Sequence, residues 1–213
     1  MKIGSFTAVR TRLVVGDGDT IALWRVADLE RHVDRVALLA ADDPPEPPYW
    51  AHLWSGAVVL AAAVPSGTRS VLELGCGLGL PGLVAAQRGA RVTFVDREPV
   101  ALAFVRASAA ANAFRAVDVV AADVLTPAIR GRFDLVLAAE LLYDRQAFGR
   151  LAGAVARYLA PGGRALLADA GRIDTVAFYD ELDAAGLRWR STAHHVREEG
   201  LPVTVRLVEV AGR

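Results

Sequence analysis

The stretch LELGCGLGLPG, from Leu72 to Gly82, places four glycines inside one of the most apolar parts of the chain. It begins in an apolar run typical of a buried strand, and a helical pattern starts at Leu80. Glycine permits a tight turn and lets a ligand come close to the main chain, and the first N–H groups of a helix lack partners. In open parallel sheets, ligands bind beyond the carboxyl ends of the strands. The stretch therefore predicts a cofactor-binding turn.

Around this turn, strand patterns alternate with helical patterns. Strands are expected at 70–75, 91–96, 117–123, 133–140, 164–170, 188–193 and 203–210, and helices at 54–64, 80–89, 99–113, 145–160 and 175–186. Ser55 should cap the first of these helices and Pro65 should end it. The first strands are continuous apolar runs, as expected where helices cover both faces. The order predicts an α/β fold: a Rossmann-like, seven-stranded, mostly parallel sheet with helices on both faces. No helical pattern separates the last two strands, so they should form a hairpin that makes the last strand antiparallel.

The residues before the sheet suggest a small N-terminal extension. Two short strands, Ala8–Val15 and Thr20–Val26, flank the turn sequence GDGD. A helical pattern covers 28–40, and the four prolines that follow cannot continue it. We therefore expect a hairpin and helix in residues 1–46, packed on a main domain of residues 47–213.

Composition argues against several classes of protein. The 213 residues include 24 basic and 24 acidic ones, so a nucleic-acid partner, which would favour a basic face, is not expected. The single cysteine, Cys76, excludes an internal disulfide and favours a reducing compartment. No apolar run approaches the ~20 residues of a membrane span, and the N-terminus lacks the apolar core of a signal peptide. His194 and His195 have no acidic or cysteine cluster nearby, so no metal site is expected. We expect a soluble, cytoplasmic monomer with no membrane partner.

Acidic residues accompany three consecutive strand patterns. Glu73 stands two residues before the first glycine of the turn. Asp96, at the end of the second strand, can accept hydrogen bonds from both hydroxyls of a ribose, and Asp123 ends the third strand. The glycine spacing is G-x-G-x-G, and Leu80 takes the place of the third glycine of dinucleotide-binding turns, which disfavours a nicotinamide-dependent oxidoreductase. The alternative interpretation is a plain tight turn, with Asp96 and Asp123 as helix caps.

Four motifs resemble a known family. The pattern E-x-G-x-G-x-G at Glu73–Gly79 resembles the first motif of class I S-adenosylmethionine-dependent methyltransferases. ELLY at Glu140–Tyr143 resembles the (D/E)-x-x-(Y/F) signature of the family-16 group of seven-β-strand protein lysine methyltransferases. PPYWAHLWSGA at Pro47–Ala57 and ADAGR at Ala168–Arg172 are similar to elements of one branch of that group. This branch methylates the electron transfer flavoprotein β subunit, and its bacterial members often carry the label predicted nicotinamide N-methyltransferase. The resemblance spans Pro47 to Gly171.

The chain departs from the family pattern at three positions. Ser55 and Ala170 stand where proline is usual, and Glu140 replaces the commoner aspartate. The resemblance implies S-adenosyl-L-methionine as cofactor and a protein lysine as acceptor, with the electron transfer flavoprotein β subunit as one candidate. A small-molecule N-methyltransferase with a nicotinamide-like acceptor, and a non-catalytic methyltransferase-like binding module, stay open as alternatives. The implied cofactor-binding residues are Trp54, Glu73, Gly75, Cys76, Gly77, Gly79, Asp96, Arg97, Asp123, Val124 and Ala139.

The resemblance also implies a catalytic pair, Glu140 and Tyr143. Methyl transfer to an amine is an in-line displacement that depends on proximity and orientation, and a lysine amine, with a pKa of ~10.4 in water, must first lose its proton. A carboxylate at the end of the fourth strand can hold the ammonium and then position the amine, while Tyr143 can add a hydroxyl or an aromatic wall. The alternatives are a helix cap for Glu140, packing for Tyr143 and His52 as general base. Cys76 is interpreted as a small buried residue and not as a nucleophile.

Overall fold

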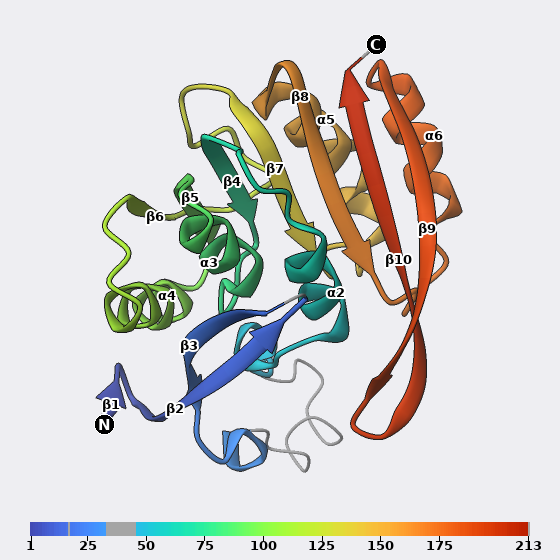
Figure 1. Cartoon of the computed structure of the whole chain (residues 1–213). Helices are drawn as coiled ribbons and strands as arrows, with labels where there is room; N and C mark the ends of the chain where they lie inside the picture. The colour runs from blue at the N-terminus through green and yellow to red at the C-terminus, as the bar shows by residue number, and fades with distance from the viewer. Residues whose placement is uncertain (17, 33–45, 213) are drawn as a thin grey trace.

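One seven-stranded sheet forms the centre of the computed structural model, which describes residues 1–16, 18–32 and 46–212 (Figure 1). In spatial order its strands are β6 (Val117–Ala121), β5 (Arg91–Asp96), β4 (Ser70–Leu74), β7 (Phe133–Ala139), β8 (Leu159–Asp169), β10 (Leu201–Gly212) and β9 (Leu187–Glu198). Neighbouring strands from β6 to β8 run parallel, and β10 runs antiparallel to both β8 and β9. The predicted fold class, including the antiparallel last strand, is confirmed.

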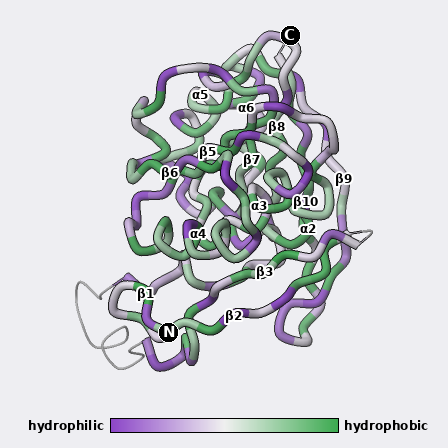
Figure 2. Tube along the Cα trace, turned by 60° about the vertical axis from the view of Figure 1, so that its left-hand side comes forward, coloured by the Kyte–Doolittle hydropathy of each residue, from purple (hydrophilic) through white to green (hydrophobic). Residues whose placement is uncertain are grey.

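Helices cover both faces of this sheet (Figure 1). One face carries α2 (Ser55–Ala63), α3 (Leu80–Gln87) and α4 (Pro99–Ala111), and the other carries α5 (Phe148–Tyr158) and α6 (Val176–Ala184). Successive residues of a strand face opposite layers of helices. Val71 and Phe94 pack with the first group of helices, and Leu72 and Val95 pack with the second. Burial on both faces explains the continuous apolar runs of the sequence, and Figure 2 shows the hydrophobic segments mainly in the interior. Within the described residues, no helix has both the length and the apolar character needed to cross a membrane.

A three-stranded antiparallel sheet precedes the core. It consists of β1 (Lys2–Ile3), β2 (Phe6–Val15) and β3 (Asp19–Val26), which confirms the two predicted strands and adds β1. The side-chain amide of Asn112, at the end of α4, accepts from the N–H of Ala22 (2.9 Å) and donates to its carbonyl (2.8 Å), as a neighbouring strand would. Of the helix predicted at 28–40, the described residues contain a 3₁₀ turn, Leu29–His32, and the rest of that prediction lies outside them. The division of the chain at residue 46 stays a prediction.

Two local predictions are wrong. α2 begins at Ser55, but its N-cap is Trp54, which makes no side-chain capping bond. Ser55 is the first residue inside the helix, so it is not the cap, and its hydroxyl donates to Glu198 on β9. The helix expected to reach residue 160 ends at Tyr158, since β8 begins at Leu159 and takes in the PGG segment that follows.

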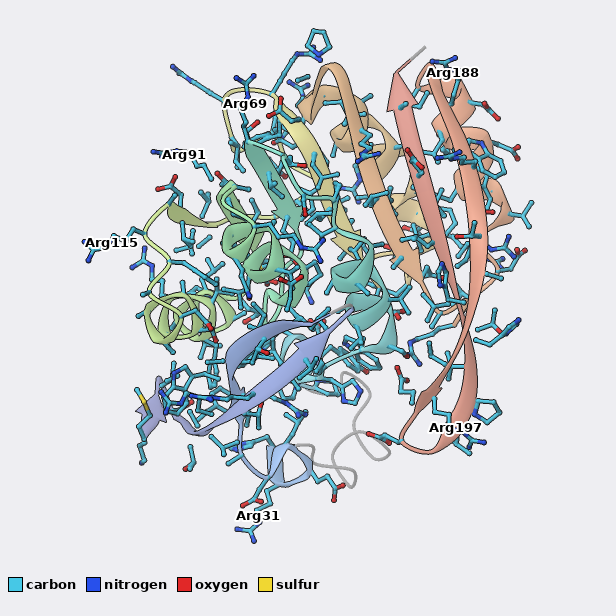
Figure 3. The ribbon with its side chains drawn as sticks, in the orientation of Figure 1. Arg31, Arg69, Arg91, Arg115, Arg188 and Arg197 are labelled. Atoms are coloured by element: carbon cyan, nitrogen blue, oxygen red, sulfur yellow. The ribbon has the colours of Figure 1, made fainter. Side chains whose placement is uncertain are left out.

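The terminal hairpin is longer than the sequence suggested. Strands β9 and β10 have 12 residues each and pair along their whole length. β10 pairs with β8 only from Arg206 to Ala211, so the half nearest the turn continues past the sheet as a two-stranded ribbon (Figure 1). Glu199 and Gly200 form the turn with φ of 50° and 84°, the left-handed conformation that a tight two-residue hairpin turn requires. In Figure 3, Arg197 marks the tip of the ribbon and Arg188 the opposite end of β9.

Candidate functional site

A cavity of about 890 Å³ lies at the carboxyl ends of β6, β5, β4 and β7. Its volume falls in the range of small-molecule sites, roughly 300–1,000 Å³. All the predicted site residues line it, namely Trp54, Glu73, Gly75, Cys76, Gly77, Gly79, Asp96, Arg97, Asp123, Val124, Ala139, Glu140 and Tyr143. The fold therefore brings the whole predicted set to one place, and the role of each member stays a prediction.

The glycine turn is shaped by backbone conformation and by close neighbours. Gly75, Gly77 and Gly79 have φ of 57°, 50° and 73°, a region that L side chains rarely adopt. A Cβ on Gly77 would lie 2.8 Å from the carbonyl oxygen of Trp50, so the chain before α2 presses against the turn. Between these glycines Cys76 is buried, and burial raises the pKa of its thiol. The thiol therefore stays protonated at neutral pH.

Two buried carboxylates hold the turn in place. Glu73 Oε2 accepts from the N–H of Gly82 (2.8 Å), and burial raises the pKa of Glu73 to about 8. Asp96 Oδ2 accepts from the N–H of Gly77 (2.8 Å), and Oδ1 accepts from the N–H of Glu98 (2.9 Å). Burial raises the pKa of Asp96 even though these hydrogen bonds oppose the shift. Because each carboxylate oxygen has a second lone pair, Asp96 can still accept hydrogen bonds from a ligand.

The remaining residues of this side of the cavity follow the ends of strands. Asp123 Oδ1 accepts from the N–H of Leu125 (2.8 Å), which fixes the turn after β6. Arg97 follows β5 and forms an ion pair with Glu46. Ala139 is the last residue of β7. Asp123 and Arg97 are carried to the cavity by the strands that precede them, and Ala139 by the strand that it ends.

Glu140 follows β7 with a left-handed φ of 55°, and three donors surround its carboxylate. Oε1 accepts from the N–H of Gly56 in α2 (3.0 Å), and Oε2 accepts from the N–H of Ala170 beyond β8 (3.3 Å). Arg172 Nε lies 3.5 Å from Oε2. Burial raises the pKa of Glu140, although the hydrogen bond from Ala170 opposes the shift. Glu140 therefore does meet a helix N-terminus, but that of α2 and not that of the next helix in the sequence.

Aromatic side chains complete the opposite side of the cavity. Trp54 Nε1 donates to the carbonyl of Tyr49 (3.0 Å), and the ring centroid lies 4.2 Å from that of His52. The guanidinium of Arg172 lies over the Trp54 ring, with its Cζ 4.4 Å from the ring centroid. Burial lowers the pKa of His52, so its imidazole is neutral at pH 7. Tyr143 is 62% exposed, so tight packing does not account for its place in the cavity wall.

Sequence reasoning missed two charged residues on this side, Arg172, which lines the cavity, and Glu198, which does not line it. Arg172 closes the ADAGR motif, which gave a signal, but no role was assigned to it. Glu198 accepts from the N–H of Ser55 (2.9 Å) and from Arg172 Nη2 (2.8 Å), although it is 143 residues from Ser55 in the sequence. No local pattern marks such a residue. In the described part of the chain, no group of three or more His, Cys, Asp or Glu side chains is placed to hold a metal ion.

Comparison with known sequences points to one class of protein. A methyltransferase-domain profile matches residues 71–163. Protein N-lysine methyltransferase METTL21A from Danio rerio is 36% identical over 111 residues, which cover 46% of this chain and 50% of that protein. EEF1A lysine methyltransferase 3 from Mus musculus is 35% identical over 104 residues, which cover 47% of this chain and 44% of that protein. The chain thus spans about half the length of the curated relatives it matches.

Solved methyltransferases share the fold. A TehB-like S-adenosylmethionine-dependent methyltransferase from Corynebacterium glutamicum superposes with a TM-score of 0.60 at 18% identity, covering 87% of this chain and 98% of that one. The 1,6-didemethyltoxoflavin-N1-methyltransferase of Burkholderia thailandensis, determined with S-adenosylhomocysteine, gives 0.58 at 20% identity, covering 75% and 77%. At these identities the likeness concerns the fold alone.

Proposed function

We propose that this chain, which belongs to the class I (seven-β-strand) methyltransferases and to their family-16 group, uses S-adenosylmethionine to methylate lysine side chains of a protein. The observation that carries the proposal is the convergence of the glycine turn, Asp96 and Glu140 on one cavity. METTL21A and EEF1A lysine methyltransferase 3 are named for lysine methylation, which supports the same acceptor here. The electron transfer flavoprotein β subunit is the first defined substrate to test.

The cavity fits S-adenosylmethionine by the chemistry of its walls. Asp96 offers free lone pairs to the ribose hydroxyls, as acidic residues at this strand end do in related folds. Asp123 offers a carboxylate to the adenine amine, with Val124 and Ala139 as apolar neighbours, and Trp54 closes the cavity. When bound, the cofactor supplies a methyl group on a sulfonium, and the sulfur leaves as a neutral thioether.

The charge of the cavity favours a cationic acceptor. Six acidic residues, Glu46, Asp96, Glu98, Asp123, Glu140 and Asp144, line it against two arginines, Arg97 and Arg172, and Glu73 adds no charge at pH 7 because burial raises its pKa to about 8. The chain as a whole has zero formal net charge, so this excess of acid is local. Clefts lined by one sign of charge concentrate ligands of the opposite sign. A lysine ammonium suits such walls better than a neutral amide such as nicotinamide.

Glu140 and Tyr143 are the residues proposed to handle the amine. Glu140 attracts the ammonium, and the raised pKa caused by burial makes its carboxylate a better acceptor for the proton that must leave. Once the amine is neutral, a hydrogen bond to Glu140 aims its lone pair at the methyl group, which converts a random encounter into an oriented one. Tyr143 guides the lysine stem at the mouth, and Trp54 excludes water. His52, whose imidazole is neutral, is the second candidate to take the proton.

Labelled methyl transfer tests the proposal. The purified chain is incubated with methyl-labelled S-adenosylmethionine and either a cell lysate or the purified electron transfer flavoprotein β subunit. We expect label in the protein fraction and methyl-lysine after hydrolysis. Label confined to small molecules would identify a small-amine acceptor. No transfer, despite S-adenosylhomocysteine binding in calorimetry, would leave a binding module and overturn the proposed activity.

We also propose that the chain works as a cytoplasmic monomer without a nucleic-acid or membrane partner. Its balanced charge and its single, buried cysteine, Cys76, support this. Light scattering during gel filtration tests the monomer, and cell fractionation tests the compartment.

A further inference from the structure

The N-terminus of α2 meets two carboxylates from distant parts of the chain. The N–H of Ser55 donates to Glu198 (2.9 Å), and the N–H of Gly56 donates to Glu140 (3.0 Å). The first N–H groups of a helix have no partners within it, and the helix dipole favours negative charge there. Both carboxylates therefore occupy positions at which the helix stabilises an anion.

Arg172 joins the two carboxylates. Its Nη2 donates to both oxygens of Glu198 (2.8 and 3.1 Å), and its Nε lies 3.5 Å from Glu140 Oε2. The same guanidinium rests on the ring of Trp54 at 4.4 Å, which is a cation–π geometry. Trp54, Glu140 and Arg172 line the cavity, and Glu198 is not among the lining residues. Glu198 can therefore influence the cavity only through the residues that it holds. We call Ser55, Arg172 and Glu198 the clasp.

The place of Glu198 is set by the terminal hairpin. It is the last residue of β9, directly before the tight turn Glu199–Gly200, so its register is fixed. The ribbon that carries it runs past the sheet, and a two-stranded ribbon is only marginally stable alone. Burial raises the pKa of Glu198, but hydrogen bonds from Ser55 and Arg172 outweigh it and lower the pKa to about 2. The contact thus ties a charged ribbon tip to the cavity wall.

Ser55 and Ala170 supply backbone donors to this arrangement, because neither is proline, which lacks an N–H. Here the N–H of Ser55 donates to Glu198, and the N–H of Ala170 donates to Glu140. The hydroxyl of Ser55 adds a further hydrogen bond to Glu198. A chain with proline at both positions would lack both of these N–H donors.

We propose that Glu198 is a positioning residue for methyl transfer, which acts through Arg172 and the N-terminus of α2 to fix Trp54 and Glu140 at the cavity. This inference rests on the proposed function. Glu198 itself touches neither the cofactor nor the acceptor, so its effect must pass through the clasp.

A double-mutant cycle tests this route. Glu198→Ala, Arg172→Ala and the double variant are compared with the wild type in single-turnover transfer to the acceptor protein that the wild type labels, and in S-adenosylhomocysteine affinity by calorimetry. Each single variant should lower the rate about 10- to 100-fold, since misplacing a reacting group by ~1 Å costs up to ~10²-fold. Affinity should weaken about 3- to 10-fold, because Trp54 loses the cation–π contact with Arg172 that supports its ring. Because both residues act as one unit, the double variant should be within about twofold of the worse single variant.

Glu209→Ala is the matched control. Glu209 lies on the same hairpin and also pairs with two arginines, Arg164 and Arg190, but it does not line the cavity. Its rate should stay within about twofold of the wild type, because exposed ion pairs contribute little. If Glu198→Ala does not fold, Glu198→Gln replaces it, since glutamine keeps an oxygen for Ser55 and loses the charge that holds Arg172.

The outcomes separate this inference from the proposed function. A Glu198→Ala enzyme as fast as the wild type overturns the positioning role, and so does a double variant whose loss is the product of the two single losses. A wild-type chain that transfers no methyl group counts against the proposed function instead. In that case the double-mutant cycle measured by S-adenosylhomocysteine affinity tests the clasp. If the single variants bind as the wild type does, or if the losses of affinity in the two single variants multiply in the double variant, the clasp is overturned.

Discussion

The two sides of the cavity are built in different ways. The cofactor side, formed by the glycine turn with Glu73, Asp96 and Asp123, is held by hydrogen bonds between residues 2 to 19 positions apart. The acceptor side, formed by Trp54, Glu140 and the clasp, is held by hydrogen bonds that span up to 143 positions. The cofactor side forms from residues at the ends of neighbouring strands, whereas the acceptor side forms only when α2, β7 and the terminal hairpin pack together. Damage to the cofactor side should therefore act on binding, and damage to the acceptor side should act mainly on rate.

The largest effect is expected from Gly77→Val on the cofactor side. The φ of 50° strains any L side chain, and a Cβ there would lie 2.8 Å from the carbonyl oxygen of Trp50. We expect no measurable S-adenosylhomocysteine binding in calorimetry, while circular dichroism shows a folded chain. Gly89→Val is the matched control, because Gly89 has a φ of 89° but no atom within 4 Å of an added Cβ, and it should bind normally. Normal binding by Gly77→Val would mean that the glycine turn does not contact the cofactor.

Glu140→Gln tests the acceptor side. Glutamine keeps an oxygen for the N–H of Gly56 but loses the charge that faces Arg172 and an incoming ammonium. We expect turnover to fall ~10²-fold or more, as for other positioned acid–base groups, with cofactor affinity changed only a few-fold. Single-turnover transfer and calorimetry measure the two quantities. A fall in affinity equal to the fall in rate would assign Glu140 to the cofactor, and an enzyme at full speed would shift the search to Tyr143 and His52.

The same contrast explains which parts of the fold and of the candidate site could be predicted from the sequence. Strands and the cofactor side were predictable because apolar runs and the acids that end them are neighbours in the chain, as at Val95 and Asp96. Glu140 could be named from its motif, but its partner Gly56 lies 84 positions away and could not. Ser55 was predicted as a cap from local preference, but the helix begins at Ser55 itself, and its hydroxyl donates to a distant carboxylate, Glu198. Local preference could not reveal this contact, because Glu198 lies 143 positions away in the sequence.

Asp96→Ala should weaken cofactor binding by less than the glycine variant. Losing hydrogen bonds between the carboxylate and the ribose hydroxyls costs about 1.5–3 kcal/mol each, and each loss raises the dissociation constant by about 10- to 150-fold. The variant also removes the acceptor for the N–H of Gly77, so the turn loosens. Calorimetry with S-adenosylhomocysteine measures the change. Asp118→Ala is the control, because Asp118 pairs with Arg91 on the exposed part of the sheet edge. An unchanged dissociation constant in Asp96→Ala would move the ribose contact elsewhere.

The smallest effect concerns the pH dependence of stability on the cofactor side. Burial raises the pKa of Glu73 from its ordinary 4.5 to about 8, so the folded chain holds a proton that the unfolded chain releases. The contribution of this proton to the free energy of unfolding is fully present below pH 4.5 and is lost as the pH rises toward 8. Glu73→Gln has no such proton and keeps an oxygen for the N–H of Gly82. Between pH 6 and 9, the wild type should therefore lose roughly 2.5 kcal/mol of stability that the variant keeps, so the Tm of the variant should rise relative to the wild type by about 5–10 °C. Glu209→Gln, at a position where Arg190 lowers the pKa, should show no such trend in calorimetric scans. A Tm difference that stays constant across this range would mean that Glu73 is already ionised in the folded chain.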